Sequence, residues 1–237
     1  MISFNSKNIT ILLYHQIGDA PKSETNLNCF CRFKDFYLQM EFLKNSDYKV
    51  ISLKEAIDMI FNIQSIDQNY VVLTFDDGCE KFYDITFPVL DKFNFPSTIY
   101  PIAGYLGKHA IINGYVHPGL KILSKKMLYD LSQLGVEIGA HTMNHFKLTQ
   151  VDNITAFNQV KISKDTIEAI IGKNINSFSF PHGDYNNDVV EIVSQAGFTN
   201  ALTCISGSAN NAKSPFELPR KYITYFDTLE IFKSKLN

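Results

Sequence analysis

Two adjacent carboxylates follow a strongly apolar run in the first half of the chain. Residues 71–78 read VVLTFDDG, so Asp76 and Asp77 end a run typical of a buried strand and stand directly before Gly78. Burying two like charges beside a core strand costs several kcal/mol unless a cation compensates them. The pair therefore indicates a bound cation. The alternative is a solvated turn, in which an Asp-Asp-Gly triplet is common.

Two histidines follow a second strand-like segment. Residues 135–145 read GVEIGAHTMNH, which places His141 and His145 four positions apart. Imidazoles at this spacing can converge on one metal, whereas a lone histidine is more often structural. Together with one carboxylate from the other strand end, they form a set of three nitrogen and oxygen ligands. Such a set suits zinc or a similar first-row metal, with a position left for water.

The order of these motifs resembles that of the polysaccharide deacetylases, the family 4 carbohydrate esterases. TFDDG at 74–78 and HTMNH at 141–145 are similar to the first two motifs of that family. FSFPHG at 178–183 is similar to the third, and LPR at 218–220 to a strand near the C-terminus. The resemblance implies an α/β fold, the distorted seven-stranded barrel of these enzymes. It also implies a hydrolase that removes N-acetyl groups from a sugar, with Zn²⁺, Co²⁺ or Ni²⁺ as cofactor.

The resemblance assigns different roles to the two aspartates. In the family the first aspartate of the pair is the catalytic base, and the second binds the metal with the two histidines. Carried over by position, Asp76 is the expected base. The expected metal ligands are Asp77, His141 and His145.

The general acid of the family is usually a histidine in a Leu-x-x-His motif near the C-terminus, but no histidine follows His182 here. The matching motif is LLYH at 12–15, so we expect His15 to be the acid. This order resembles a circularly permuted subgroup that includes bacterial poly-N-acetylglucosamine deacetylases. Without the other motifs, a histidine that bonds a backbone group at a strand end would be the default interpretation.

The third motif lacks the arginine that often orients the catalytic aspartate, and Ser179 and its neighbours occupy that region. The chain has two arginines, Arg32 and Arg220. We expect Arg220 to take this role, because a guanidinium holds a carboxylate through two parallel hydrogen bonds. The alternative is a surface salt bridge. We expect Pro181, His182 and Gly183 to contact substrate, with the His182 backbone N–H near the oxyanion and its ring along the sugar site.

Strand-like and helix-like segments alternate along the chain, which indicates a parallel α/β sheet or barrel. Helices are predicted at 33–45, after Ser52, and at 83–93, 124–134, 154–171, 188–196 and from 228. The strands between them include 9–14, 49–51, 97–102, 200–204 and 217–224, and residues 103–119 and 205–216 are predicted to be loops at the rim of a sugar site. Adjacent side chains on a strand point to opposite faces. Asp76 and Asp77 can therefore reach one metal only if the backbone leaves strand geometry there, which Gly78 allows.

Length and composition fit one catalytic domain over residues 1–237, with 45% hydrophobic residues for a large core. A net charge of −2 gives no electrostatic footprint for nucleic acid. The start of the chain lacks the features of a signal peptide, and the four cysteines show no disulfide pattern, so a cytoplasmic or cytosol-facing location is expected.

The expected partner is an N-acetylated sugar of a surface polysaccharide, a lipopolysaccharide or a lipid-linked precursor. A lipid-linked substrate would bring the protein into peripheral contact with a membrane. Two alternatives stay open at this point. One is a metal-dependent hydrolase of another non-peptide amide, and the other is a degenerate barrel that binds carbohydrate without turnover.

Overall fold

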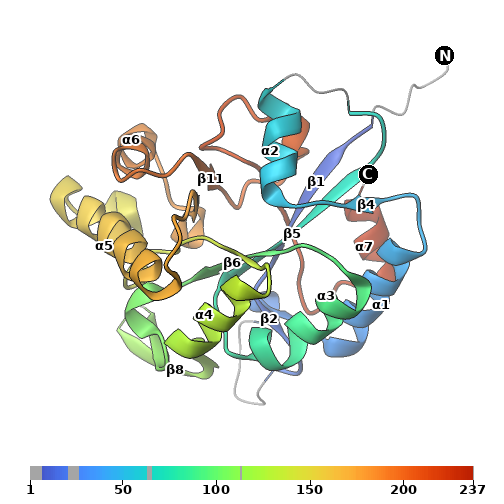
Figure 1. Cartoon of the computed structure of the whole chain (residues 1–237), viewed down its shortest axis with the longest axis horizontal. Helices are drawn as coiled ribbons and strands as arrows, with labels where there is room; N and C mark the ends of the chain where they lie inside the picture. The colour runs from blue at the N-terminus through green and yellow to red at the C-terminus, as the bar shows by residue number, and fades with distance from the viewer. Residues whose placement is uncertain (1–6, 21–26, 63–65, 113, 237) are drawn as a thin grey trace.

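Strands and helices alternate along the chain in the computed structural model, which describes residues 7–20, 27–62, 66–112 and 114–236 (Figure 1). The helices are α1 (Phe33–Lys44), α2 (Leu53–Phe61), α3 (Phe87–Phe93), α4 (Lys125–Gln133), α5 (Asn153–Ile171), α6 (Asn187–Gln195) and α7 (Leu229–Lys235). The main strands are β1 (Ile9–Tyr14), β4 (Lys49–Val50), β5 (Tyr70–Asp77), β6 (Thr98–Pro101), β9 (Glu137–Ile138), β10 (Ser177–Ser179), β11 (Asn200–Leu202) and β12 (Lys221–Tyr222). There are also two short pairs of strands. One is β2 (Gln16–Ile17) with β3 (Phe30–Cys31), and the other is β7 (His109–Ile112) with β8 (Tyr115–Lys121).

Side-chain caps begin most of the helices. Ser52 precedes α2 and accepts a hydrogen bond from the Glu55 backbone N–H, while the Glu55 carboxylate accepts one from the Ser52 N–H. This reciprocal pair satisfies two helix-end donors and confirms the predicted capping box. Ser124, Asp152 and Thr228 cap α4, α5 and α7 in the same way through their side chains. Local sequence therefore fixes where these helices start.

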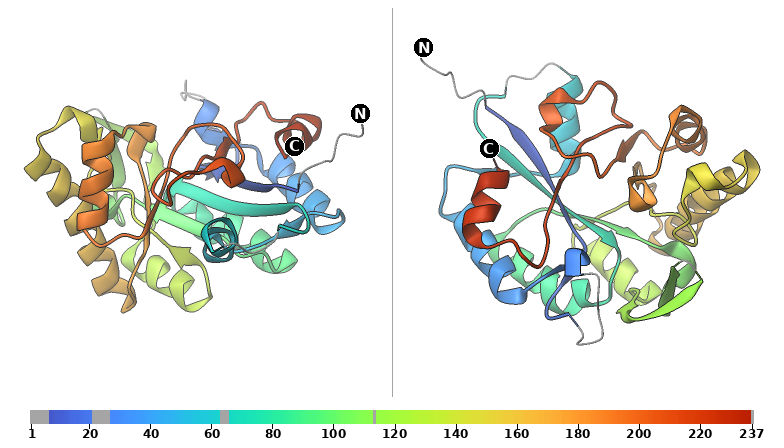
Figure 2. Two further views of the ribbon diagram at one scale, coloured as in Figure 1. Left: turned by 90° about the horizontal axis from the view of Figure 1, so that it is seen from above. Right: turned by 180° about the vertical axis from the view of Figure 1, so that it is seen from behind.

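The strands close into a ring in which every pairing is parallel. The main sheet has the order β12-β1-β5-β6-β9, with β4 paired to the start of β5. An isolated bridge between Ala140 and Phe178 joins the end of β9 to β10, and β10 pairs with β11. A second bridge, between Leu202 and Leu218, returns the ring to the segment before β12. The helices surround this ring (Figure 2), which confirms the predicted distorted α/β barrel.

Side chains alternate between the two faces of each strand, which separates a core inside the barrel from a core between the strands and the helices. Ile9 and Ile11 of β1 pack with Val72 of β5 in the barrel interior, whereas Leu12 and Tyr14 of β1 pack with the helices. Every second residue of a strand points to the same face. His15 therefore follows the inward-facing residues of β1, and Thr74 and Asp76 follow Val72 on the inner face of β5. The same alternation that buries the inner core therefore brings polar side chains to the C-terminal end of the barrel.

Three segments differ from the sequence predictions. Residues 103–119 are not a simple loop, because the antiparallel pair β7 and β8 occupies much of them. The helix expected over 83–93 is divided into a π-helical turn, Phe82–Thr86, and α3, which has Pro88 in its first turn where a missing N–H is tolerated. The strand expected over 217–224 is regular only in β12, because Pro219 has no N–H and the Arg220 N–H bonds to the Ile205 carbonyl.

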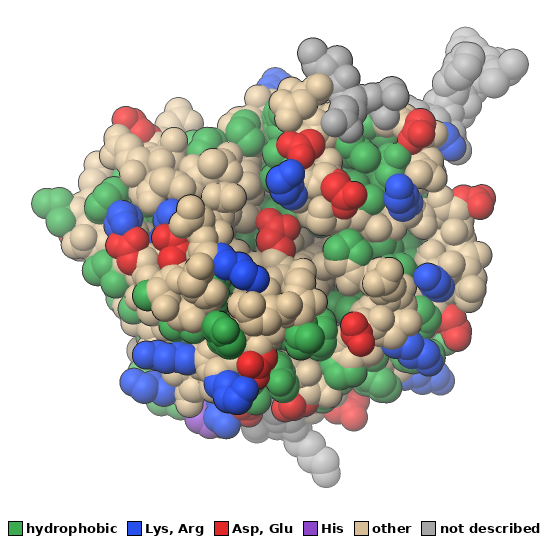
Figure 3. Space-filling model, in the orientation of Figure 1, with side chains coloured by type: hydrophobic (Ala, Val, Ile, Leu, Met, Phe, Trp, Pro, Cys, Tyr) green, Lys and Arg blue, Asp and Glu red, His purple; other side chains and the backbone are tan. Residues whose placement is uncertain are grey.

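Lysines and carboxylates are interspersed over the face shown in Figure 3, with apolar side chains between them. Among the described residues, no helix has the length and apolar character needed to cross a membrane.

Candidate active site

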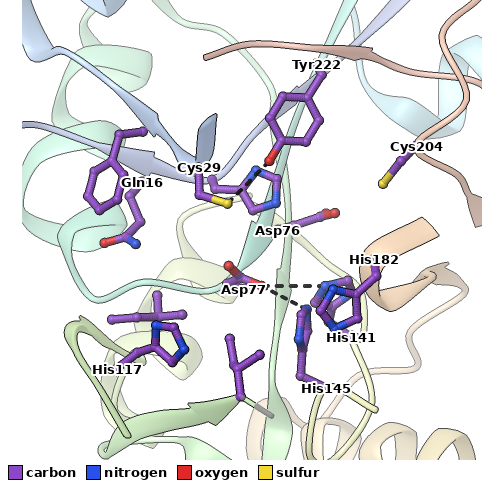
Figure 4. Close-up of a pocket in the computed structure, with 14 residues that line it drawn as sticks. Gln16, Cys29, Asp76, Asp77, His117, His141, His145, His182, Cys204 and Tyr222 are labelled. Atoms are coloured by element: carbon purple, nitrogen blue, oxygen red, sulfur yellow. Dashed lines mark hydrogen bonds and ion pairs between the residues drawn. The ribbon is translucent and has the colours of Figure 1, made fainter. Parts of the chain in front are cut away.

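A cavity of about 470 Å³ opens at the C-terminal ends of the parallel strands, the end at which α/β barrels build their sites. His15 follows β1, Asp76 and Asp77 end β5, and the loop after β9 carries His141 and His145. These side chains meet in one cavity although they come from three separate parts of the chain (Figure 4). The lining residues are His15, Gln16, Cys29, Phe30, Asp76, Asp77, Ile112, His117, Leu120, His141, His145, His182, Cys204 and Tyr222.

The backbone leaves strand geometry at the carboxylate pair. Asp77 has φ +66° and Gly78 has φ +74°, both in the left-handed region. A Cβ on Gly78 would lie 2.6 Å from the Cα of Pro101, so only glycine fits there. The expected departure from the strand is present, and it begins at Asp77 itself. As a result, the two carboxylates face different partners.

Asp77 lies between the two histidines. Its Oδ1 atom is 3.6 Å from Nε2 of His141 and 3.4 Å from Nε2 of His145, as the dashed lines in Figure 4 mark. These distances are too long for hydrogen bonds. They match the spacing of about 3.4 Å between two ligands that each lie 2.0–2.1 Å from one tetrahedral metal. Among the described residues, these three form a group that could hold a metal ion.

The protonation state of the two histidines also fits a metal. Burial lowers the pKa of His141 to about 4 and that of His145 to about 3, so both rings are neutral at pH 7. Nδ1 of His141 lies 2.8 Å from the Ser179 carbonyl, to which it donates as N–H, and this leaves the Nε2 lone pair facing Asp77. Oδ1 of Asp77 is buried without a hydrogen-bond partner. An unpaired buried carboxylate oxygen beside two neutral imidazoles is a set of donors suited to a cation.

Left-handed backbone conformations cluster at this site. Of the described non-glycine residues with positive φ, Asp77, Thr142, His145 and His182 belong to the site loops, and Asn94 caps a helix. A non-glycine residue in this region costs on the order of 1–3 kcal/mol, which the surrounding structure must offset. The Thr142 hydroxyl helps by accepting a hydrogen bond of 2.9 Å from the His145 N–H. This hydrogen bond closes a turn within the loop that carries His141 and His145.

Asp76 is held by Arg220 rather than by the histidines. The two terminal nitrogens of Arg220 donate to the two carboxylate oxygens of Asp76 at 2.8 and 2.7 Å. The remaining guanidinium donors go to Thr74 Oγ1, Ser179 Oγ and the Thr203 carbonyl. All five N–H donors of this fully buried side chain are thereby used. The predicted role of Arg220 agrees with this geometry, and a surface salt bridge is excluded.

The charge on Asp76 follows from two opposed effects. Burial raises the pKa of the Asp76 carboxyl, but the adjacent Arg220 charge and its hydrogen bonds outweigh burial and hold that pKa well below its usual range. The Ser179 hydroxyl adds a hydrogen bond of 2.9 Å to the same carboxylate. Asp76 is consequently ionised at neutral pH. Three of its roughly four lone-pair sites are used, and one remains for a water or substrate proton.

His15 lies half-buried in the cavity wall, packed on a tyrosine. Its ring centroid is 5.0 Å from that of Tyr222, and its Nδ1 atom is buried without a hydrogen-bond partner. The Tyr222 hydroxyl lies 3.4 Å from Sγ of Cys29. The structure therefore places His15 where a leaving group in the cavity could reach it.

The third-motif residues occupy different positions. His182 lines the cavity, and its ring centroid is 4.4 Å from that of His145. Pro181 is buried and Gly183 packs against Cys204, so neither lines the cavity as expected for a substrate contact. The geometry supports the prediction for His182 alone. The prediction that all three residues contact substrate is too broad, because only His182, the middle residue of the turn, lines the cavity.

Sequence reasoning missed the support of this site by Thr74 and Tyr222. Tyr222 follows Arg220 by two residues, and strand alternation places both on the inner face of the barrel. That spacing could have identified it. Thr74 carries no such signal, because a threonine in an apolar strand is common and its partner Arg220 lies 146 residues away in the sequence.

A sequence profile of the family described as polysaccharide deacetylase matches residues 64–201, more than half of the chain. This chain belongs to the polysaccharide deacetylase family. Poly-β-1,6-N-acetyl-D-glucosamine N-deacetylase of Staphylococcus epidermidis is 27% identical over 195 residues, which are 77% of this chain and 65% of that protein. The enzyme of the same name from Staphylococcus aureus is 24% identical over 242 residues, with 94% of this chain and 81% of that protein covered.

Solved structures show the same fold. Deacetylase PplD of Streptococcus pyogenes, in complex with acetate, superposes with a TM-score of 0.83 at 24% identity, covering 97% of this chain and 98% of that one. IcaB from Ammonifex degensii gives a TM-score of 0.82 at 19% identity and covers 97% of each chain. The barrel is therefore that of the polysaccharide deacetylases over nearly its whole length.

Replacement of Arg220 by lysine is expected to lower the free energy of unfolding by roughly 2–4 kcal/mol, because an ammonium group cannot make the paired contact with Asp76. Urea unfolding of the metal-free protein measures this effect. Arg32→Lys, at the partly exposed second arginine, is the matched control and is expected to change it by less than about 0.5 kcal/mol. Equal decreases in the free energy of unfolding for the two substitutions would contradict a stabilising role for the paired hydrogen bonds between Arg220 and Asp76.

Proposed function

We propose that this chain is a metal-dependent N-deacetylase that removes acetyl groups from a β-1,6-linked N-acetylglucosamine polymer. The single observation that carries the proposal is the division of the Asp76-Asp77 pair: Asp77 lies with two neutral histidines, while Arg220 holds Asp76 ionised beside them. The polymer is inferred from the names of the staphylococcal relatives. The acetate complex of PplD agrees with the expected product.

The ligand set is assigned to Asp77, His141 and His145. A divalent metal held there, such as zinc, would polarise the acetamide carbonyl and acidify the attacking water, which a base as weak as Asp76 requires. The identity of the metal belongs to the proposal. Zinc is preferred because two imidazoles and one carboxylate are an ordinary zinc ligand set, but cobalt and nickel suit the same donors.

Asp76 acts as the base that accepts the proton of the attacking water. Its free lone pair lies on the side of the carboxylate that Arg220 and Ser179 leave open, and Arg220 keeps the carboxylate from rotating. Pro181 has no N–H, so the first backbone donor after it is the N–H of His182, on the cavity wall. We assign to that N–H a hydrogen bond to the oxyanion of the tetrahedral intermediate, a contact worth roughly 3–4 kcal/mol in comparable sites.

His15 acts as the acid. An amine leaves from a tetrahedral intermediate only when its nitrogen is protonated, because an amine anion is a very poor leaving group. His15 carries an imidazole, the side chain most often used for proton transfer in catalysis, and it lines the same cavity as Asp76. The products are acetate and the free amino sugar. A barrel that binds sugar without turnover would leave the acid, the base and the ligand set without a role.

Acetate release from N-acetylglucosamine oligomers, with and without zinc, tests the proposal. We expect one zinc per chain, release by the loaded protein, and none after chelation. Asp77→Asn is expected to lose both zinc and activity. Asp76→Asn is expected to keep zinc while kcat falls by about 10²–10⁴-fold, because the proton acceptor is removed. Its free energy of unfolding should fall as well, because the buried Arg220 loses its counter-charge.

Asp188→Asn, at an exposed carboxylate on α6, is the control and should leave zinc content and kcat unchanged. Full activity of Asp76→Asn, or stoichiometric zinc in Asp77→Asn, would contradict the assigned roles. Zinc binding with no acetate release from any N-acetylated sugar would favour the non-catalytic barrel or another amide substrate.

The role of His15 predicts a dependence on the leaving group. His15→Asn is expected to lower kcat/KM for the N-acetyl sugar by about 10²-fold or more, because the amine needs a proton to leave. The same variant should hydrolyse 4-nitrophenyl acetate at close to the wild-type rate, since 4-nitrophenolate leaves without a proton. His109→Asn, at an exposed histidine of β7, is the control. Equal losses on both substrates would show that His15 only supports the structure.

A further inference from the structure

One buried polar side chain of the catalytic cavity has no role in the proposed mechanism. Gln16 directly follows the proposed acid His15, and both residues line the cavity. Gln16 is only 4% exposed, so its amide group is almost entirely removed from bulk water. A side-chain amide in such a place is stable when both its oxygen and its NH₂ group have hydrogen-bond partners. The partners of this amide therefore indicate what the cavity binds.

The amide oxygen of Gln16 is paired within the protein. The thiol of Cys79, the residue after Gly78, donates a hydrogen bond of 3.5 Å to this oxygen. Cys79 is itself buried, and its backbone forms a bridge with Ile122. The contact orients the amide, because it places the oxygen toward Cys79 and the NH₂ group on the other side of the same plane.

The NH₂ group of Gln16 donates no hydrogen bond to another of the described residues. A buried donor that opens into a cavity is satisfied by a water molecule or by a ligand. Figure 4 shows Gln16 and the proposed metal ligand His145 on opposite sides of Asp77. This donor is therefore separate from the groups that would bind the metal.

An aromatic side chain lies beside this amide. Phe30 is paired with Gln16 between β2 and β3, so the two side chains share one face of the pair, and both line the cavity. An apolar ring next to a single oriented donor suits a sugar, which presents C–H groups and hydroxyl oxygens side by side. A buried donor also discriminates between ligands, because one that lacks the acceptor leaves the donor unpaired.

The position of His15 indicates which part of a substrate Gln16 meets. We assign His15 to the leaving amine, and the Cα of the next residue, Gln16, is about 3.8 Å from that of His15. The amine nitrogen is bonded to the sugar ring on one side and to the acetyl group on the other. The acetyl carbonyl belongs at the metal site, and Gln16 lies on the side of Asp77 away from His145. Gln16 therefore faces the sugar ring.

We propose that the side-chain amide of Gln16 donates a hydrogen bond to a hydroxyl oxygen of the sugar unit whose acetamide is hydrolysed, and that Cys79 positions this amide. The inference rests on the proposed function and adds a specificity-determining residue to it. In a β-1,6-linked chain, an internal unit has free hydroxyls at C3 and C4. A unit that lacks the partner hydroxyl is then a poor substrate.

Acetate release by the zinc-loaded protein from a set of β-1,6-linked N-acetylglucosamine trimers tests the inference. The set holds the natural trimer, a trimer without 3-hydroxyls and a trimer without 4-hydroxyls. We expect kcat/KM of the natural trimer to exceed that of one deoxy trimer by about tenfold or more, because a buried donor is left unpaired. In Gln16→Met, which keeps the side-chain length without a donor, this ratio should fall close to unity. Gln133→Met, at an exposed glutamine on α4, is the control and should keep the wild-type ratio.

A substrate without a sugar separates this contact from a structural role. 4-Nitrophenyl acetate carries an acetyl group only, so Gln16→Met should hydrolyse it at close to the wild-type rate and retain its zinc. Cys79→Ala is expected to lower the natural-to-deoxy ratio by about threefold, because the amide of Gln16 is no longer oriented. Cys79→Ser keeps a donor at this position and should keep the ratio closer to that of the wild type.

The outcomes separate the inference from the proposed function. No acetate from any trimer would contradict the proposed function. Acetate release at the same kcat/KM from all three trimers would overturn the inference alone. Equal losses in Gln16→Met on the trimers and on 4-nitrophenyl acetate would also overturn it, and would give Gln16 a structural role. An unchanged natural-to-deoxy ratio in Cys79→Ala would overturn the positioning role of Cys79.

Discussion

The guanidinium of Arg220 is fully buried, and a charge in that position is stable only when a counter-charge lies against it and every N–H has an acceptor. Asp76 supplies the counter-charge, and Thr74, Ser179 and Thr203 supply the other acceptors. Removing any one of these leaves a buried donor unpaired. The contact therefore ties β5, β10 and the segments around β11 and β12 together at one point in the barrel. It also decides which of two adjacent carboxylates remains for a metal.

The second carboxylate is separated from the first by the backbone. Asp77 turns into the left-handed region, and Gly78 passes Pro101 at a distance that no Cβ would allow. One residue is thus bound to a guanidinium inside the barrel, and the next faces two neutral histidines in the cavity. Burial lowers the pKa values of those histidines, so the same dry environment that strengthens the Arg220 contact keeps the imidazoles ready for a metal. The separation of the proposed base, Asp76, from the proposed metal ligand, Asp77, follows from one local change in chain direction.

Much of this arrangement could be predicted from the sequence, because several site residues and helix starts depend on residues that are close together in the chain. The TFDDG and HTMNH segments each hold several site residues on one strand end, and the capping box at Ser52 fixes the start of α2. What could not be predicted depends on contacts between distant segments. Thr74 gains its role only because Arg220 folds back against it. The β7–β8 pair was not predicted, because the glycines and short apolar runs in 103–119 resemble a loop. The closure of the barrel could not be predicted either, because it depends on single-residue bridges that leave no strand pattern in the sequence.

The most direct test of the division between Asp76 and Asp77 is a crystal structure of the zinc-loaded protein with anomalous data at the zinc edge. We predict one zinc within about 2.0–2.2 Å of an Asp77 oxygen and of one nitrogen each from His141 and His145. Asp76 should remain in its paired contact with Arg220. Zinc bound by Asp76, or an Asp76 carboxylate released from Arg220 in the loaded protein, would contradict it.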